Sequence, residues 1–303
     1  MDSLNRSDRK QNIPPPEQAG ISAVIPVYNR PRFVRRAVES VFRQTAPPAE
    51  LIVVDDGSTD DTPGTLEALR KTADGSFRII THRENQGVSA ARNTGIRTAG
   101  TDWIALLDSD DTWHPEKLAR QMAYHRDHPD LKISQCNEQW IRDGKPVNKR
   151  KIHRKTGGRI FVESLKRCLV SPSAVLMHRS LFEDIGYFDE SLPACEDYDL
   201  WLRVLTRYPI GLLDEPLVTR YGGHPDQLSA RYWGMDRWRV QAMEKHVDRP
   251  LPPDWKAALY RELVAKLEIL CQGAEKRDKP EAVRYREKLH TYRVELQAQQ
   301  AGG

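Results

Sequence analysis

The sequence predicts an α/β fold: a mostly parallel sheet flanked by helices, followed by a helical hairpin. Between about residues 21 and 128, apolar runs typical of strands alternate four times with amphipathic runs typical of helices. The predicted strands are apolar on both faces, as strands buried in a parallel sheet are. Acidic clusters follow the second and fourth strands. Because such sheets bind ligands beyond the carboxyl ends of their strands, we expect these acids to open onto one crevice.

The four predicted strands are short, apolar and rich in β-branched residues, which is typical of buried strands. We place them within residues 21–28, 49–56, 77–83 and 102–108. The segments that follow carry apolar residues three and four positions apart, the period of an amphipathic helix. We place these helices within residues 31–44, 62–72, 87–99 and 115–128.

The middle and the end of the chain follow other patterns. Between about residues 130 and 225 the pattern is irregular, with strand-like runs at 133–141 and 174–180 and a helix-like run at 196–208. Towards the end, leucine and aromatic residues recur every three or four positions on both sides of a break at 271–281. This predicts a helical hairpin, which we expect to pack on the main domain or on another copy of the chain.

The composition is that of a soluble globular protein, since 30% of the 303 residues are charged and 39% are apolar. The net charge of +4 is too small, and the basic residues too scattered, to indicate a nucleic-acid-binding protein. One basic run, KRKIHRK at 149–155, fits either a solvated loop or contact with an anionic partner. No apolar run reaches the length of a membrane span, so no transmembrane segment is expected.

The first 20 residues are polar and contain three consecutive prolines, so we expect a disordered leader without a signal peptide. The four cysteines form no C-x-x-C pair, which favours a reducing compartment and gives no sign of a zinc site. These features predict a cytoplasmic protein.

Three carboxylates end the fourth predicted strand, in LLDSDDTWHPEKL: Asp108, Asp110 and Asp111. One such acid commonly caps a helix, but three repel one another unless a cation lies among them. A calcium EF-hand is excluded, because Trp113 and Ala119 stand where that loop needs glycine and glutamate. Two interpretations stay open: a helix cap, or a Mg²⁺ or Mn²⁺ site shared with a substrate diphosphate.

No glycine-rich phosphate-binding loop of the G-x-G-x-x-G or G-x-x-x-x-G-K-[ST] type is present. A nucleotide bound here must therefore be held through its base and ribose, with its phosphates neutralised by the metal. The Asp56 carboxylate can accept a hydrogen bond from a base N–H, and that of Asp108 can accept one from a ribose hydroxyl.

Two further polar clusters follow. Glu196 and Asp197 lie at a predicted helix start, where either the helix dipole or a general-base role explains acids. Arg220 and His224 lie beside a pair of glycines, where they either meet a leaving diphosphate or are only solvated.

Five stretches occur in the order and approximate spacing of family 2 glycosyltransferases with the GT-A fold: VIPVYNR, ELIVVDDGSTDDT, ENQGVSAARNTGI, IALLDSDDTWHPEKL and CEDYDLWLRV. The chain resembles this family over about residues 21–225. The resemblance implies a GT-A, Rossmann-like fold with a nucleotide-binding half at about 21–120 and an acceptor half at about 121–225. The leader at 1–20 and a C-terminal helical extension at 226–303 complete the predicted domains.

The resemblance also implies roles for particular residues. Those implied to bind the nucleotide sugar are Pro26, Tyr28, Asp56, Arg92, Asp108 and Asp111. Asp110 is the implied ligand of Mn²⁺ or Mg²⁺, and Asp197 is the implied catalytic base, with Glu196 beside it. Arg220 and His224 are implied to lie near the diphosphate or the acceptor, although TRYGGH departs from the family's Tyr-Arg-x-His pattern.

The implied reaction is inverting transfer of a sugar from a nucleoside-diphosphate sugar to an acceptor hydroxyl. A UDP-sugar is favoured, with dTDP and GDP left open. The implied setting is bacterial surface-glycan assembly, with a glycan or a lipid-linked glycan as acceptor and peripheral contact at the inner face of the membrane.

Two alternatives to this enzyme stay open. One is a non-catalytic glycan- or nucleotide-binding protein of the same fold, which the intact acids disfavour. The other is a nucleotidyltransferase, which needs glycine and lysine in the loop after the first strand; PVYNRPRF contains neither. A homo-oligomer formed through the C-terminal helices is compatible with each of these functions.

Overall fold

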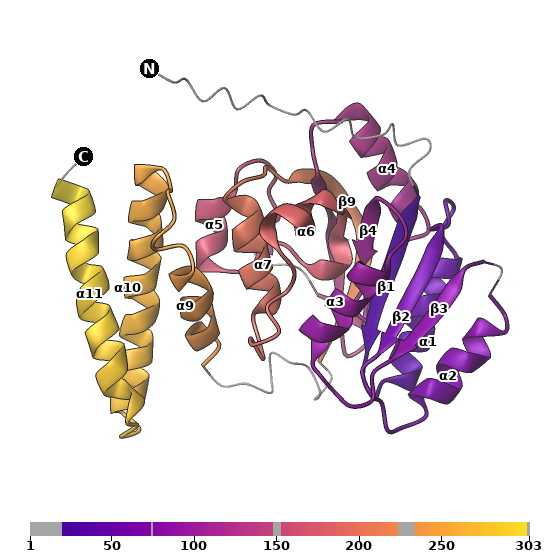
Figure 1. The fold of residues 1–303 in the computed structure, drawn as a ribbon, viewed down its shortest axis with the longest axis horizontal. Coiled ribbons are helices and arrows are strands. Elements are labelled where there is room, and N and C mark those ends of the chain that lie inside the picture. The colour runs from indigo at the N-terminus through magenta and orange to yellow at the C-terminus, as the bar shows by residue number, and fades with distance from the viewer. Residues whose placement is uncertain (1–19, 74, 148–152, 224–233, 302–303) are drawn as a thin grey trace, which may run out of the picture.

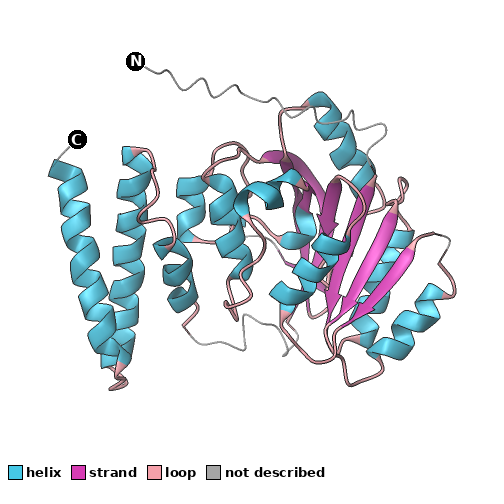
Figure 2. Ribbon diagram, viewed as in Figure 1, coloured by secondary structure: helices cyan, strands magenta, loops and turns pink. Residues whose placement is uncertain are grey.

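The computed structural model describes residues 20–73, 75–147, 153–223 and 234–301. It is an α/β fold with helices on both faces of one sheet and two long antiparallel helices at the end of the molecule away from the first strands (Figure 1, Figure 2). The predicted fold class is confirmed.

The first half of the sheet is parallel, as predicted. It contains β1 (Ile21–Val27), β2 (Glu50–Asp55), β3 (Phe77–Thr81) and β4 (Trp103–Leu106), in the spatial order β3-β2-β1-β4. Every residue of β1, β2 and β4 is buried, because helices cover both faces of these strands. Their unbroken apolar runs follow from that burial.

The second half of the sheet mixes both directions, so the sheet is less parallel than the sequence predicts. β8 (Val175–His178) pairs antiparallel with β4 and with β6 (Ile133–Arg142), and β9 (Gly211–Gly222) runs parallel to β6. Two short strands complete it: β5 (Thr112–Trp113), antiparallel to β9, and β7 (Lys145–Val147), antiparallel to β6.

The sheet separates two hydrophobic cores. Successive strand residues point to opposite faces, so Ala23 and Ile25 pack in one core while Val24 packs in the other. The helices of the first core are α1 (Pro31–Phe42), α2 (Thr62–Arg70) and α4 (Lys117–Asp127). Those of the second include α3 (Val88–Thr98), α5 (Phe161–Lys166), α6 (Ser180–Ile185) and α7 (Glu196–Leu205). A 3₁₀ turn, η2 (Pro172–Ala174), precedes β8.

The C-terminal part is helical: α9 (Asp236–Glu244), α10 (Pro253–Glu275) and α11 (Glu281–Ala301). The last two form the predicted hairpin, and Leu259, Leu263 and Leu267 of α10 are fully buried. They belong to the same core as α5 and α7, and Trp255 stacks on Phe161 with ring centroids 5.0 Å apart. None of the described helices is long and apolar enough to span a membrane.

Two expectations fall outside the described residues. The predicted leader falls almost entirely within residues 1–19, and the boundary proposed at 225/226 falls within residues 224–233.

Candidate active site

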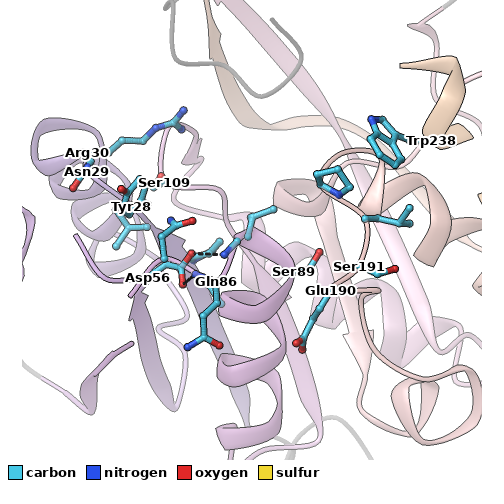
Figure 3. Close-up of a pocket in the computed structure, with 18 residues that line it drawn as sticks. Tyr28, Asn29, Arg30, Asp56, Gln86, Ser89, Ser109, Glu190, Ser191 and Trp238 are labelled. Atoms are coloured by element: carbon cyan, nitrogen blue, oxygen red, sulfur yellow. Dashed lines mark hydrogen bonds between the residues drawn. The ribbon is translucent and has the colours of Figure 1, made fainter. Parts of the chain in front are cut away.

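The turns after β1, β2, β3 and β4 meet at one edge of the sheet, because the carboxyl ends of parallel strands share that edge. Backbone hydrogen bonds fix them there: Asp56 N–H donates to the Val27 carbonyl at 2.9 Å, and His82 N–H donates to the Asp55 carbonyl at 2.9 Å. A cavity of about 670 Å³, called here the large cavity, opens over these turns. Its walls come from residues 26–30, Asp56, 85–89, Ala91, Ser109, 190–193 and Trp238 (Figure 3).

The Asp56 carboxylate is held rigidly in the wall of the large cavity. The residue is 2% exposed, and its carboxylate accepts hydrogen bonds from the backbone N–H groups of Gln86 at 3.0 Å and Gly87 at 2.8 Å (Figure 3). His82 Nδ1 lies 2.6 Å from the same carboxylate. The predicted neighbours Pro26 and Tyr28 line this cavity as well. Three of the residues predicted to hold the nucleotide are therefore together.

Arg92 follows Ala91 of the cavity wall and joins two acidic segments far apart in the chain. Its guanidinium is buried, with Nη2 2.7 Å from Asp108 Oδ1 and Nη1 2.7 Å from Glu196 Oε1. Glu196 and Asp197 are the first two residues of α7. The Arg92 bridge therefore brings the start of α7 close to the turn after β4. Burial, and then the charge of Asp197, raise the pKa of Glu196 against the opposing effect of Arg92.

The other two acids of the turn have different partners. Arg30 Nη1 lies 2.9 Å from Asp110 Oδ2, and Arg36 Nη2 donates to the Asp110 carbonyl at 2.9 Å. Asp111 is buried and accepts a 2.7 Å hydrogen bond from the Ser173 hydroxyl, which in turn accepts one from Asp108 N–H at 3.1 Å. The turn is thus fixed by a serine of η2.

A second cavity of about 70 Å³, called here the small cavity, contains the predicted base. Residues lining it include Glu138, Trp140, Lys155, Ser171, Asp197 and Arg220. Cys168 Sγ donates to Asp197 Oδ2 at 3.6 Å. Burial and the charge of Asp197 raise the pKa of the Cys168 thiol well above its usual range, so it stays a neutral donor.

The turn after β4 that carries Asp108, Asp110 and Asp111, called here the acidic turn, lies between the two cavities. Ser109 lines the large cavity, whereas Arg220, which lines the small one, has Nε 3.7 Å from Asp111 Oδ2. In the wall of the small cavity, Lys155 Nζ lies 2.9 Å from the buried Glu138 carboxylate. Burial acts against the ionised form of Glu138, yet Lys155 and Arg220 lower its pKa to about 2.

Comparison with known proteins identifies the family. The family model described as Glycosyl transferase family 2 matches residues 22–186, more than half of the chain. The chain belongs to glycosyl transferase family 2. An uncharacterized glycosyltransferase of Rickettsia conorii, RC0461, is 31% identical over 198 residues, which is 65% of this chain and 32% of that protein. The putative glycosyltransferase EpsH of Bacillus subtilis is 39% identical over 121 residues, 40% of this chain and 34% of its own length. The chain thus spans about a third of each of these relatives.

Solved glycosyltransferase structures share the fold. The crystal structure of S. aureus TarS 1–349 in complex with UDP-GlcNAc has a TM-score of 0.68 and 18% identity, covering 93% of this chain and 92% of that one. The mannosyltransferase PcManGT from Pyrobaculum calidifontis, in complex with GDP-Man and Mn²⁺, has a TM-score of 0.61 and 19% identity. This match covers 95% of this chain and 86% of that one.

The residues of this family 2 chain fit a divalent ion that is shared with a substrate. No three His, Cys, Asp or Glu side chains in the described ranges could hold a metal by themselves. Burial, and then the charges of Asp110 and Asp108, nevertheless raise the pKa of Asp111 well above its usual range, against the effect of Arg220. A cation would relieve this repulsion. Mg²⁺ commonly binds through one or two carboxylates and substrate phosphates, which this turn can supply.

Sequence reasoning missed several residues of this site. His82 and Ser173 orient Asp56 and the acidic turn, and Arg30 pairs with Asp110. Arg30 lies in the short turn between β1 and α1, where its position could have indicated a role. Ser173 lies in the irregular middle region, where no pattern distinguishes it. The predicted His224 is outside the described residues.

Proposed function

We propose that this chain is an inverting glycosyltransferase that moves a sugar from a nucleoside-diphosphate sugar to an acceptor hydroxyl. The observation that carries the proposal is the Arg92 bridge, with 2.7 Å contacts to both Asp108 and Glu196. It brings the acids after β4 to the helix that begins with Glu196 and Asp197. A donor held at the first segment therefore has its reactive end near the second.

The large cavity is the proposed donor site. Pro26 and Tyr28 border the base there, and Asp56 accepts a hydrogen bond from it. Two backbone N–H groups and His82 already fix the direction of the Asp56 carboxylate. UDP is the favoured nucleotide, which the UDP-GlcNAc complex of TarS supports; the GDP-Man complex of PcManGT keeps GDP as the competing choice.

Asp110, supported by Asp108, is the proposed holder of Mn²⁺ or Mg²⁺, and the Mn²⁺ complex of PcManGT supports this. When bound, such an ion supplies positive charge that offsets the charge developing on the leaving diphosphate. Arg30 lines the large cavity as well as pairing with Asp110. With a cation held at Asp110, the Arg30 guanidinium would contact the diphosphate.

The acceptor enters through the small cavity, where Asp197 is the proposed general base. Asp197 takes the proton of the acceptor hydroxyl, whose oxygen forms a bond to the anomeric carbon as the bond to the diphosphate breaks. Asp197 lines the small cavity rather than the large one, which supports attack from the side opposite the nucleotide and hence inversion. The further proposal of a role in bacterial surface-glycan assembly includes peripheral contact with the inner face of the membrane where the acceptor is lipid-linked.

The variant Asp197→Asn tests the base assignment. We expect transfer to fall by about 10²–10⁴-fold, because the amide cannot take the proton. The affinity for UDP, measured by calorimetry, should stay within about twofold, since Asp197 does not line the donor cavity. Transfer is measured as nucleotide release from UDP-GlcNAc and GDP-mannose with a panel of oligosaccharide acceptors.

The exposed Asp130, changed to Asn, is the matched control and should leave both measurements unchanged. An Asp197→Asn enzyme that transfers sugar at the wild-type rate would refute the assignment.

A further inference from the structure

We propose that the C-terminal extension completes the donor site: Trp238 of α9, with Leu192 and Pro193, forms the wall on which the transferred sugar ring packs. This inference rests on the proposed function and adds the residues that recognise the sugar. From its leucine periodicity the extension is expected only to pack. The structure places one of its side chains in the wall of the large cavity.

The large cavity has two unlike sides. Figure 3 shows Tyr28, Asn29 and Asp56 on one side and Trp238 and Ser191 on the other, with Ser89 and Glu190 between them. The Asp56 side is polar and carries the proposed base contacts. The opposite side combines an indole ring with the apolar side chains of Leu192 and Pro193.

This apolar wall lies at the reactive end of the proposed donor. Pro193 is four residues before Asp197, so the loop that forms the wall runs directly into the start of α7. A nucleotide whose base lies at Asp56 and whose diphosphate lies beside Arg30 and Ser109 extends its sugar toward the rest of the cavity. The sugar therefore meets the wall made by Leu192, Pro193 and Trp238.

The chemistry of the wall suits a sugar ring. One face of a pyranose presents mainly C–H groups, which pack on aromatic and aliphatic surfaces, while its hydroxyls need polar partners at the edge. Trp238 Nε1 is buried and has no hydrogen-bond partner among the described residues. This N–H is closed off from the cavity, so the ring surface of Trp238 is the part that packs against the sugar.

Ion pairs fix the wall in place. Lys245, the residue after α9, makes two ion pairs. Its Nζ lies 2.5 Å from Oδ2 of Asp189, which adjoins the loop 190–193, and 2.6 Å from Oδ1 of Asp199 in α7. The hairpin holds α9 in turn, since Lys288 Nζ of α11 lies 2.7 Å from the Glu244 carboxylate. A wall positioned before the ligand arrives loses little entropy on binding.

Calorimetry with paired ligands tests this inference. Each nucleoside diphosphate is compared with its sugar, in Mn²⁺, for the wild-type chain and for Trp238→Ala: UDP with UDP-GlcNAc, UDP-glucose and UDP-galactose, GDP with GDP-mannose, and dTDP with dTDP-glucose. We expect the wild-type chain to bind one of these sugars more tightly than its diphosphate. Trp238→Ala should lose about tenfold in affinity for that sugar, as removal of an aromatic contact does, and stay within about twofold for the diphosphate.

Two further variants separate binding from folding. Trp238→Leu keeps an apolar side chain but removes the flat ring and its N–H, so it should show the same selective loss if Trp238→Ala does not fold. Trp255→Ala removes an indole from the same extension, where it packs on Phe161 and does not line the large cavity. Trp255→Ala should leave unchanged the ratio between the affinity for the nucleotide sugar and the affinity for its diphosphate.

The outcomes are distinct. If no nucleotide binds the wild-type chain, the proposed function itself fails. If the wild-type chain binds nucleotides but no sugar adds affinity, the wall assignment fails and the proposed function stands. The assignment also fails if the Trp238 variants weaken diphosphate and sugar equally, or weaken neither.

Discussion

At the scale of single residues, the site depends on a few ion pairs between side chains that are shielded from solvent. Arg92 is buried, and it neutralises Asp108 and Glu196, which come from segments about 90 residues apart. The resemblance implies a place for Arg92 near the nucleotide. In the structure it does not line the large cavity, and it joins the two acidic segments. No pattern in one sequence could predict this pairing, because both partners depend on the tertiary fold.

Arg92→Met should lower the free energy of unfolding by about 3–5 kcal/mol at pH 7, because it leaves the buried Glu196 carboxylate and the partly buried Asp108 carboxylate without their cation. Urea denaturation measures this. The pKa of Glu196 is already raised in the folded chain, and it rises further without Arg92. A carboxyl whose folded pKa exceeds its unfolded value binds more protons when folded, so lower pH stabilises it. The stability that Arg92→Met loses relative to the wild-type chain should therefore become smaller as the pH is lowered from 7 to 5.

Arg97→Met is the control for this variant. Arg97 is exposed and lies 3.7 Å from Glu190, so its loss should cost no more than about 1 kcal/mol. Equal losses for the two variants, or a deficit for Arg92→Met that does not change with pH, would contradict the role given to Arg92.

At the scale of elements, the sequence best predicts the strands that helices cover on both faces. The strands β1, β2 and β4 and the helices between them follow clear periodicities, and strand direction alone places the acids after β2 and β4 at one edge of the sheet. β9 is not predicted, because Asp214, Glu215 and Pro216 interrupt its apolar pattern. They lie at an irregularity in its pairing with β6, where the register shifts around Asn137.

Helix α3 shows a packing constraint that its sequence hides. A Cβ on Gly95 would lie 2.3 Å from Val24 Cγ1 in the buried β1 strand, so α3 depends on glycine to approach the sheet. Gly95→Ala should destabilise the fold by about 1–3 kcal/mol, despite the better helix propensity of alanine. Thermal and urea denaturation measure this change.

Gly273→Ala in α10 is the matched variant. Its Cβ would meet only the flexible end of Arg277, at 2.8 Å from Nη2. That side chain can move aside, so helix propensity should dominate and stabilise the fold by up to about 1 kcal/mol. A Gly95→Ala chain as stable as Gly273→Ala would show that α3 has room to shift.

At the scale of the whole molecule, the helical extension shares one of the two hydrophobic cores with the main domain, and it contributes Trp238 to the large cavity. The family resemblance ends near residue 225, so no motif could indicate a site residue beyond it. The periodicity of the hairpin predicts its packing face, but it cannot predict that α9 reaches the cavity. The fold class and the acidic edge were therefore predictable, whereas the partners of each acid and the far wall of the cavity were not.

The central claim is that a divalent ion at the acidic turn after β4 tethers the nucleotide sugar, and it makes Asp110→Ala the most direct variant to measure. The measurement is the shift in unfolding temperature caused by UDP, GDP and their sugars, with and without Mn²⁺. For the wild-type chain, Mn²⁺ should raise the affinity for one nucleotide sugar by at least about tenfold, or about 1.4 kcal/mol. Asp110→Ala should lose that increment and match the wild-type chain without metal. Equal affinities for the two chains in Mn²⁺ would contradict the claim.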